Sequence, residues 1–232
     1  MKLLLGRGAD VEVINEAGKT AENVASENSK FEVASFLAEY KSDAEVQNKI
    51  HLSALDPAQI LVVTEKERKE KEKAMLHRAV EEGKVEIVRS LLDNGEDVNS
   101  ENASNKTALD LAAAKGHLEV VSLLIERGAD VDSRDKLGRT PLHEASRYGH
   151  LQVSRELIRY GANVNASKQD HSTPIHLSAR NGHLKVVELL LERGADVRVS
   201  NDEGRTPYQL AMGRGYRKIA ELLREYERER YA

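Results

Sequence analysis

A period of 33 residues is the feature that most restricts how this 232-residue chain can fold. One threonine series and two glycine series follow this period. The members are Thr107, Thr140, Thr173 and Thr206; Gly116, Gly149, Gly182 and Gly215; and Gly95, Gly128, Gly161 and Gly194. A fixed period of this length is typical of stacked copies of one supersecondary unit, in which each copy contacts only its neighbours. The chain is therefore expected to be a repeat protein.

The residues of one period, 138–167, predict a helix–turn–helix unit. We expect Thr140 to be an N-cap whose hydroxyl accepts a backbone N–H bond, and Pro141 suits the first helical position. Gly149 is expected to end this helix in the left-handed conformation. A second helix follows, and Gly161 is expected to end it.

Three short motifs in this register resemble the ankyrin repeat. They are Thr-Pro-Leu-His at 140–143 with Thr-Pro-Ile-His at 173–176, Gly-His-Leu at 116–118, 149–151 and 182–184, and Gly-Ala-Asp-Val at 128–131 and 194–197. The resemblance covers nearly the whole chain. It implies an all-α ankyrin-repeat solenoid of stacked helix–turn–helix units, with β-hairpin-like turns that project from one edge.

The register predicts three parts, of which the middle one is an insert. Residues 1–49 are predicted to be degenerate ankyrin units that start in mid-repeat, as in a fragment of a longer array. Residues 50–71 are predicted to be an insert or linker with a mixed-charge run, and residues 72–232 to be five repeats including a C-terminal cap. Three alternatives stay open for the insert: a solvated helix that continues into the next repeat, a partner-binding segment, or disorder.

Composition excludes several classes of function. The net charge of −4 gives no general attraction to nucleic acid or to an anionic membrane. The chain has no cysteine, and no apolar run approaches the length of a membrane-spanning helix. We expect a cytoplasmic monomer, with a nuclear location as the alternative. The lack of cysteine would also suit an engineered scaffold.

Histidine pairs seven residues apart, such as His143 with His150 and His176 with His183, invite a metal-site interpretation. A glycine directly before the later histidine argues against it, because that glycine ends the helix. The ankyrin resemblance implies structural roles instead: the first histidine bonds a neighbouring turn, and the second bonds the loop between helices. The chain has none of the common nucleophile or phosphate-binding motifs. We therefore predict no enzyme activity, no metal and no cofactor.

The positions that vary between repeats predict the binding surface, because the repeated positions are occupied by the framework. We expect a protein or peptide partner, acidic in character, to bind the concave face and the turn tips rather than nucleic acid. A regulatory or targeting segment of a larger enzyme or channel is the alternative. The predicted partner-binding residues are Lys115, Lys136, Leu137, Arg139, Arg147, Tyr148, Gln169, Asp170, Arg180, Asn181, Arg205 and Arg214.

Overall fold

The computed structural model describes residues 57–231, with side chains described for residues 69–230. All ten elements of that part of the chain are α-helices. Residues 57–76 and 86–97 belong to one compact unit, and residues 77–85 and 98–231 to another. The predicted degenerate repeats at 1–49 lie outside the described residues.

The first two described helices are α3 (Pro57–Glu81) and α4 (Val85–Asp93). Helix α3 begins at a proline, which suits a first helical position because it lacks an N–H group. It runs without interruption for 25 residues from the predicted insert into the first helix of the following repeat. For residues 57–71 the structure thus agrees with the helical alternative. Helix α4 is amphipathic and buries Ile87, Val88 and Leu91.

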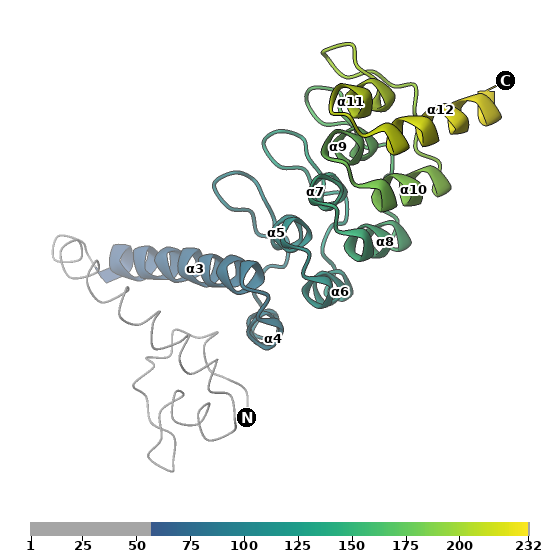
Figure 1. Ribbon diagram of the computed structural model, residues 1–232. Helices are drawn as coiled ribbons and strands as arrows, with labels where there is room; N and C mark the ends of the chain where they lie inside the picture. The colour runs from purple at the N-terminus through teal and green to yellow at the C-terminus, as the bar shows by residue number, and fades with distance from the viewer. Residues whose placement is uncertain (1–56, 232) are drawn as a thin grey trace. The chain divides into compact units, whose positions relative to one another are not determined.

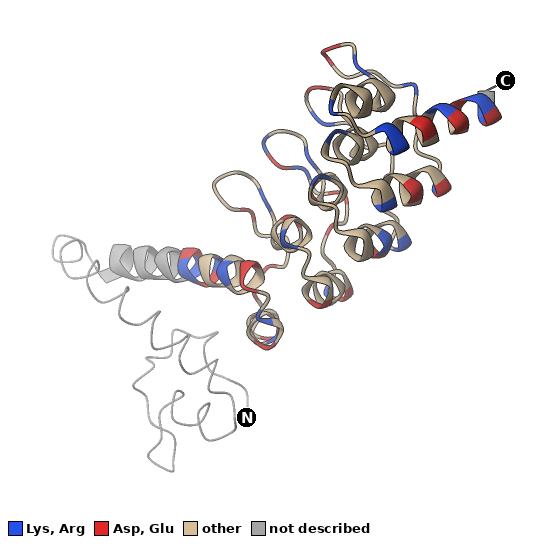
Figure 2. Ribbon diagram, viewed as in Figure 1, with Lys and Arg blue, Asp and Glu red and all other residues tan. Residues whose placement is uncertain are grey.

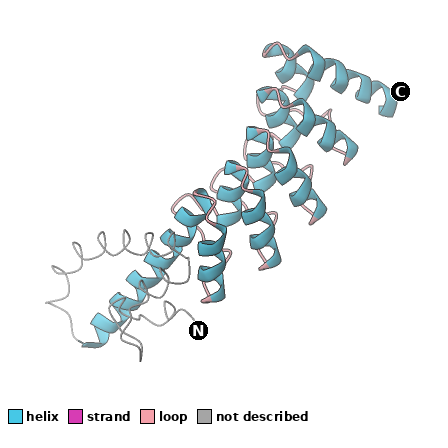
Figure 3. Cartoon of the chain, turned by 60° about the horizontal axis from the view of Figure 1, so that its bottom comes forward, coloured by secondary structure: helices cyan, strands magenta, loops and turns pink. Residues whose placement is uncertain are grey.

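Residues 98–231 form a stack of four helix pairs, shown along its length in Figure 3. The first helices pack against one another in sequence order, and so do the second helices, which gives two layers (Figure 1). The fold predicted from the ankyrin resemblance is confirmed here. The pairs are α5 (Ala108–Lys115) with α6 (Leu118–Glu126), α7 (Pro141–Tyr148) with α8 (Leu151–Arg159), α9 (Pro174–Asn181) with α10 (Leu184–Glu192), and α11 (Pro207–Gly213) with α12 (Arg217–Tyr231).

The core between the two layers consists of leucine, isoleucine, valine and alanine at repeating positions. The largest side chains that are almost fully buried include Leu109, Leu124, Leu142, Leu157, Ile175, Leu190 and Leu223. A thin core of this kind needs few aromatics, because each repeat buries its apolar surface against the next repeat. The hydrophobic contribution therefore grows with each added pair.

Threonine begins the first helices with capping boxes whose partner at the third helical position is Asp110 in α5 and His143 in α7. The Thr107 hydroxyl accepts the backbone N–H of Asp110 at 3.3 Å, as expected of an N-cap. Thr140 begins α7 with a capping box in which its side chain accepts the backbone N–H of His143, as predicted. In return, Nδ1 of His143 accepts the backbone N–H of Thr140 at 3.1 Å and lies 2.9 Å from the Thr140 hydroxyl.

Glycine ends the helices as predicted. Gly149 is the C-cap of α7, with φ 78° and an N–H bond to the carbonyl of Ala145. Gly161, just after α8, has φ 94°. These left-handed conformations favour glycine because it has no Cβ.

The turns that precede α5, α7, α9 and α11 project on one side of the stack (Figure 1). Each closes on itself, as in the bond from the Asp135 N–H to the Arg139 carbonyl at 3.0 Å. Neighbouring turns also bond each other through the backbone. Lys136 N–H donates to Ser104 at 3.1 Å, Gln169 N–H to Leu137 at 3.0 Å, and Asp202 N–H to Asp170 at 3.0 Å. The turns thus form a continuous hairpin-like edge, although no residue of 57–231 is in a strand.

Candidate interaction surface

Four exposed cations mark the ends of the first helices: Lys115 on α5, Arg147 on α7, Arg180 on α9 and Arg214 at the C-cap of α11. We call them the basic row. Because α5, α7, α9 and α11 pack consecutively, the four side chains follow one another along the stack. No salt bridge of these cations is present among residues 69–230. The row is therefore open to an external anion.

Tyr148 gives the basic row an aromatic surface. Its side chain is 49% exposed at the last position of α7. The guanidinium carbon of Arg147 lies 5.3 Å from the centre of its ring, within the range of a cation–π contact. Arginine and tyrosine are enriched among the residues that dominate binding energy at protein interfaces.

A matching pair lies at the end of the second helix of the same repeat. The guanidinium carbon of Arg159 is 5.4 Å from the ring centre of Tyr160, which is 41% exposed. Arg159 also forms an ion pair with Glu156 at 3.5 Å. The two pairs have the same chemistry on different layers, so that each can serve as a control for the other.

Several predicted partner-binding residues lie on the turn edge. Lys136 and Leu137 are exposed, and Leu137 is 49% exposed at its turn tip. Gln169 is exposed and donates through Nε2 to the carbonyl of Lys136 at 2.8 Å. Asn181, at the end of α9, is exposed and bonds the carbonyl of Leu177. These side chains are accessible, but the two amides already have intramolecular partners.

Two turn residues are held by ion pairs. Asp170 pairs with Lys168, and its Oδ1 accepts the N–H of Ser172 at 2.9 Å. Burial opposes ionisation there, but these bonds dominate and lower the pKa of Asp170 to about 2. Arg205 is exposed and lies 3.4 Å from Glu203. Asp170 is thus ionised at neutral pH.

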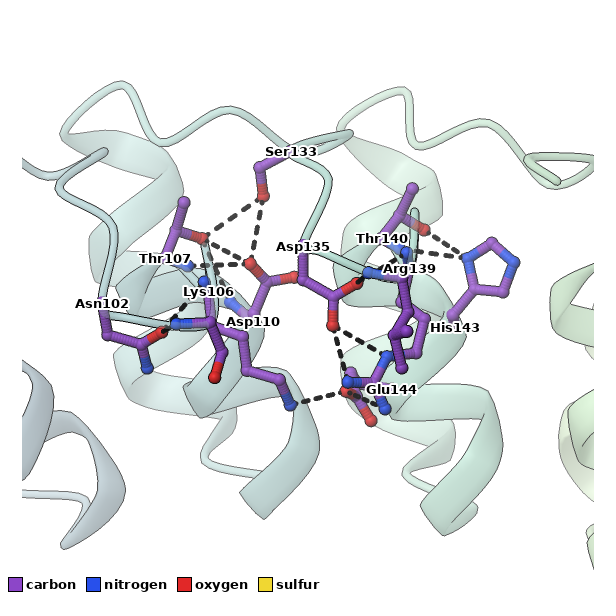
Figure 4. A network of polar contacts seen from close by, with 12 residues as sticks. Asn102, Lys106, Thr107, Asp110, Ser133, Asp135, Arg139, Thr140, His143 and Glu144 are labelled. Carbon is purple, nitrogen blue, oxygen red and sulfur yellow. Dashed lines mark hydrogen bonds and ion pairs between the residues drawn. The ribbon is translucent and has the colours of Figure 1, made fainter. Parts of the chain in front are cut away.

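Arg139 differs from the other predicted partner-binding residues, because its side chain is only 15% exposed. Its Nε donates to Asp135 at 2.7 Å, and a second nitrogen lies 3.2 Å from Glu144. Lys106 reaches the same Glu144 oxygen at 2.8 Å from the adjacent turn. Figure 4 shows these side chains converging between two repeats. Arg139 therefore ties its own turn to α7, and its guanidinium is not free.

The sequence interpretation did not identify Glu144. It is 1% exposed on α7. Leu111, Leu177 and Leu210 are at the equivalent positions of the other repeats and are buried. The signal was present in the register: a carboxylate at a leucine position requires cations nearby. Asp135 supplies a second anion, and hydrogen bonds from Arg139 and Leu137 outweigh burial and lower its pKa.

Asp110 is a second buried carboxyl of this region, at the position that His143 and His176 have in the next repeats. Its Oδ2 accepts the N–H and the hydroxyl of Thr107, both at 2.9 Å. Its Oδ1 is buried without a hydrogen-bond partner among the described residues. Burial outweighs the bonds from Thr107 and raises the pKa of Asp110 to about 7.

The histidines tie neighbouring repeats together. His143 accepts at Nδ1 from the Thr140 N–H, so the proton is on Nε2, which donates to the carbonyl of Ser172 at 3.1 Å. Burial lowers the pKa of His143 to about 4, and the ring is therefore neutral at pH 7. His150 and His183 bond the carbonyls of Ala114 and Arg147 in the repeat before. These are the turn and loop contacts that the ankyrin resemblance implies.

Among the residues with described side chains, no group of three or more histidine, aspartate or glutamate side chains is placed to hold a metal ion. The helices of residues 57–231 include none that is both long and apolar enough to cross a membrane. The first-helix ends present the basic row, with the exposed ring of Tyr148 beside Arg147.

The fold and the surface define a helical repeat protein with an exposed basic face. A family model described as ankyrin repeats (3 copies) matches the chain over the overlapping ranges 1–102, 50–135, 76–168, 127–201 and 156–230. The chain belongs to the ankyrin-repeat family. Ankyrin repeats are generally protein–protein interaction modules. No curated protein matches the chain.

Proposed function

We propose that the chain is a non-catalytic interaction scaffold that binds an acidic protein or peptide through the basic row and the neighbouring turn tips. The observation that supports this most is the combination of four exposed, unpaired cations with Tyr148 on consecutive first helices. Aligned charges of one sign raise the local concentration of an oppositely charged ligand and speed its association.

The framework gives the surface its rigidity. Backbone bonds join adjacent turns, and histidines join adjacent loops. The Lys106–Glu144–Arg139 ion pairs add a further link between two repeats. A surface that is already ordered loses little conformational entropy when a ligand binds. Arg139 contributes to this framework, and the proposed interface does not depend on it.

An acidic protein is favoured over nucleic acid by the surrounding charge. Asp170, Asp202 and Glu203 lie on the turn edge, and Glu81 and Glu82 lie at the end of α3. Carboxylates at these places would repel the backbone of a nucleic acid, which carries a negative charge at every nucleotide. A peptide can place its charges discontinuously and avoid them.

The test is to capture partners with the full chain and to map where each one binds. Amide hydrogen exchange of the chain should slow, on addition of the partner, at the ends of α7 and α9 and in the turns before them. Protection confined to α6, α8 and α10 would place the interface on the second helices and would contradict the proposal.

A further inference from the structure

The basic row and the regular stacking of the first helices carry an inference about the shape of the ligand, which rests on the proposed function. We propose that the row fits an acidic peptide segment in the polyproline II conformation, with carboxylates at every third residue. Four carboxylates of a ten-residue segment would then meet Lys115, Arg147, Arg180 and Arg214 in turn.

Cations occur on the helices of both layers (Figure 2), and helix C-termini favour them because unpaired carbonyls give that end a partial negative charge. On the second layer, Arg159 pairs with Glu156, and the C-cap residues Arg127 and Arg193 directly follow Glu126 and Glu192. On the first layer, no ion pair of Lys115, Arg147, Arg180 or Arg214 is present among residues 69–230. The charge of the basic row is thus not balanced by carboxylates in that part of the chain.

The spacing between packed helices sets the spacing of the charges. Helix axes in contact lie about 8–10 Å apart. Polyproline II has three residues per turn and rises about 3.1 Å per residue, so side chains three residues apart face the same way at about 9 Å. This period coincides with the step from one first helix to the next. Each turn of the ligand would meet one repeat.

Other backbone conformations match the row less well. In a β-strand, side chains on one face recur every second residue at about 6.6 Å, which is out of step with the helices. In an α-helix, residues seven apart lie about 10.5 Å apart on one face, so four contacts would require roughly 22 residues. Ordering the longer segment costs more conformational entropy for the same four ion pairs.

Tyr148 adds a reason for this conformation. Its ring is half exposed beside Arg147 near the middle of the row. Aromatic side chains in grooves are common contact surfaces for proline in polyproline II ligands. A proline between two carboxylates of the segment would lie against the Tyr148 ring and would also hold the ligand in its bound conformation.

The experiment measures binding of the full chain to peptides made of four glutamates and six prolines. One peptide has glutamate at positions 1, 4, 7 and 10, and a second of the same composition has it at positions 1, 2, 9 and 10. The regular peptide should bind about tenfold more tightly, because two mispaired contacts of roughly 0.7 kcal/mol each amount to that factor. A helical peptide with glutamates seven residues apart should bind more weakly than the regular peptide.

The variants separate this inference from the proposed function. Arg147→Ala/Tyr148→Ala should weaken binding of the regular peptide, whereas Arg159→Ala/Tyr160→Ala should leave it unchanged. If the first variant weakens binding but both glutamate arrangements bind equally, the proposed register is overturned and the interface stands. Tighter binding of the helical peptide also overturns the register. If neither variant changes binding, the proposed location of the interface fails as well.

Discussion

The imidazole of His150 fills the space beside Gly116 in the preceding repeat. Its Nε2 lies 3.0 Å from the carbonyl oxygen of Ala114. A Cβ atom added at Gly116 would lie 2.5 Å from Nδ1 of the same ring. Position 116 therefore requires glycine for two reasons: the backbone φ is 77°, and the His150 ring occupies the place of a Cβ atom.

The first prediction compares Gly116→Ala with Gly128→Ala. Gly128 has φ 88°, and a Cβ there would meet no described atom within 4 Å. Both substitutions should lower the free energy of unfolding by about 1–2 kcal/mol because of the left-handed backbone. Gly116→Ala should lower it by roughly a further 1–3 kcal/mol, because the methyl group collides with the His150 ring. Urea unfolding measures both values. Equal losses would show that the histidine contact is not tight in solution.

The second prediction compares two arginines at equivalent turn positions, 66 residues apart. Arg139→Ala removes the partner of buried Asp135 and one partner of buried Glu144, so it should lower the free energy of unfolding by about 2–4 kcal/mol. Arg205 is exposed and pairs only with exposed Glu203 among the described residues. Arg205→Ala should therefore change stability by less than about 0.5 kcal/mol. A small effect of Arg139→Ala would contradict a structural role for the network in Figure 4.

The third prediction concerns the pH dependence of stability. Because burial raises the pKa of Asp110 to about 7, from an ordinary value near 3.8, the folded state takes up a proton that the unfolded state does not hold between those values. This proton stabilises the fold at low pH, and the benefit is lost as pH rises from about 4 to 7. Asp110→Asn keeps a neutral group of similar shape. It should be more stable than the natural chain by roughly 1–3 kcal/mol at pH 8.

The difference in free energy of unfolding between Asp110→Asn and the natural chain isolates the Asp110 carboxyl, since His143 titrates in both proteins. Burial lowers the pKa of His143 to about 4, so its contribution to stability is lost as pH falls from about 6.5 toward 4. This pH dependence is opposite to that of Asp110. The free energy of unfolding of both proteins, measured at pH 5 and at pH 8, is sufficient for the comparison. A difference that does not grow toward pH 8 would mean that Asp110 has an ordinary pKa.

The fourth prediction is that partner binding weakens as salt increases. The cations of the basic row are exposed, and interactions among exposed charges are screened over about 8 Å at physiological ionic strength. The dissociation constant should therefore rise steadily as sodium chloride is added, mainly through slower association. An affinity that salt leaves unchanged would point to an apolar interface around Tyr148 rather than an electrostatic one.

Sequence reasoning could predict the framework because each framework position has a local physical cause. Gly149 and Gly161 mark backbone that must turn left-handed, and Pro141 marks a first helical position. Such requirements depend on residues close in sequence. The period then extends them to every repeat.

The polar network could not be predicted in the same way, because it depends on the stacking of two repeats. Lys106 and Glu144 are 38 residues apart, and only the stacking brings them to 2.8 Å. Arg139 was predicted to be a partner-binding residue from its turn position, but two buried carboxylates hold its side chain in the structure. The role of the basic row depends on a ligand and stays a prediction.

The most direct test of the account is the dissociation constant of a captured partner measured for two matched double variants. Arg147→Ala/Tyr148→Ala removes the stacked pair on the first-helix layer, and Arg159→Ala/Tyr160→Ala removes the equivalent pair on the second. If the basic row is the interface, the first variant should lose about 2–4 kcal/mol of binding free energy, roughly 30-fold to 1,000-fold in affinity. The second should bind as the natural chain does. Unchanged affinity of Arg147→Ala/Tyr148→Ala would contradict the proposed interface.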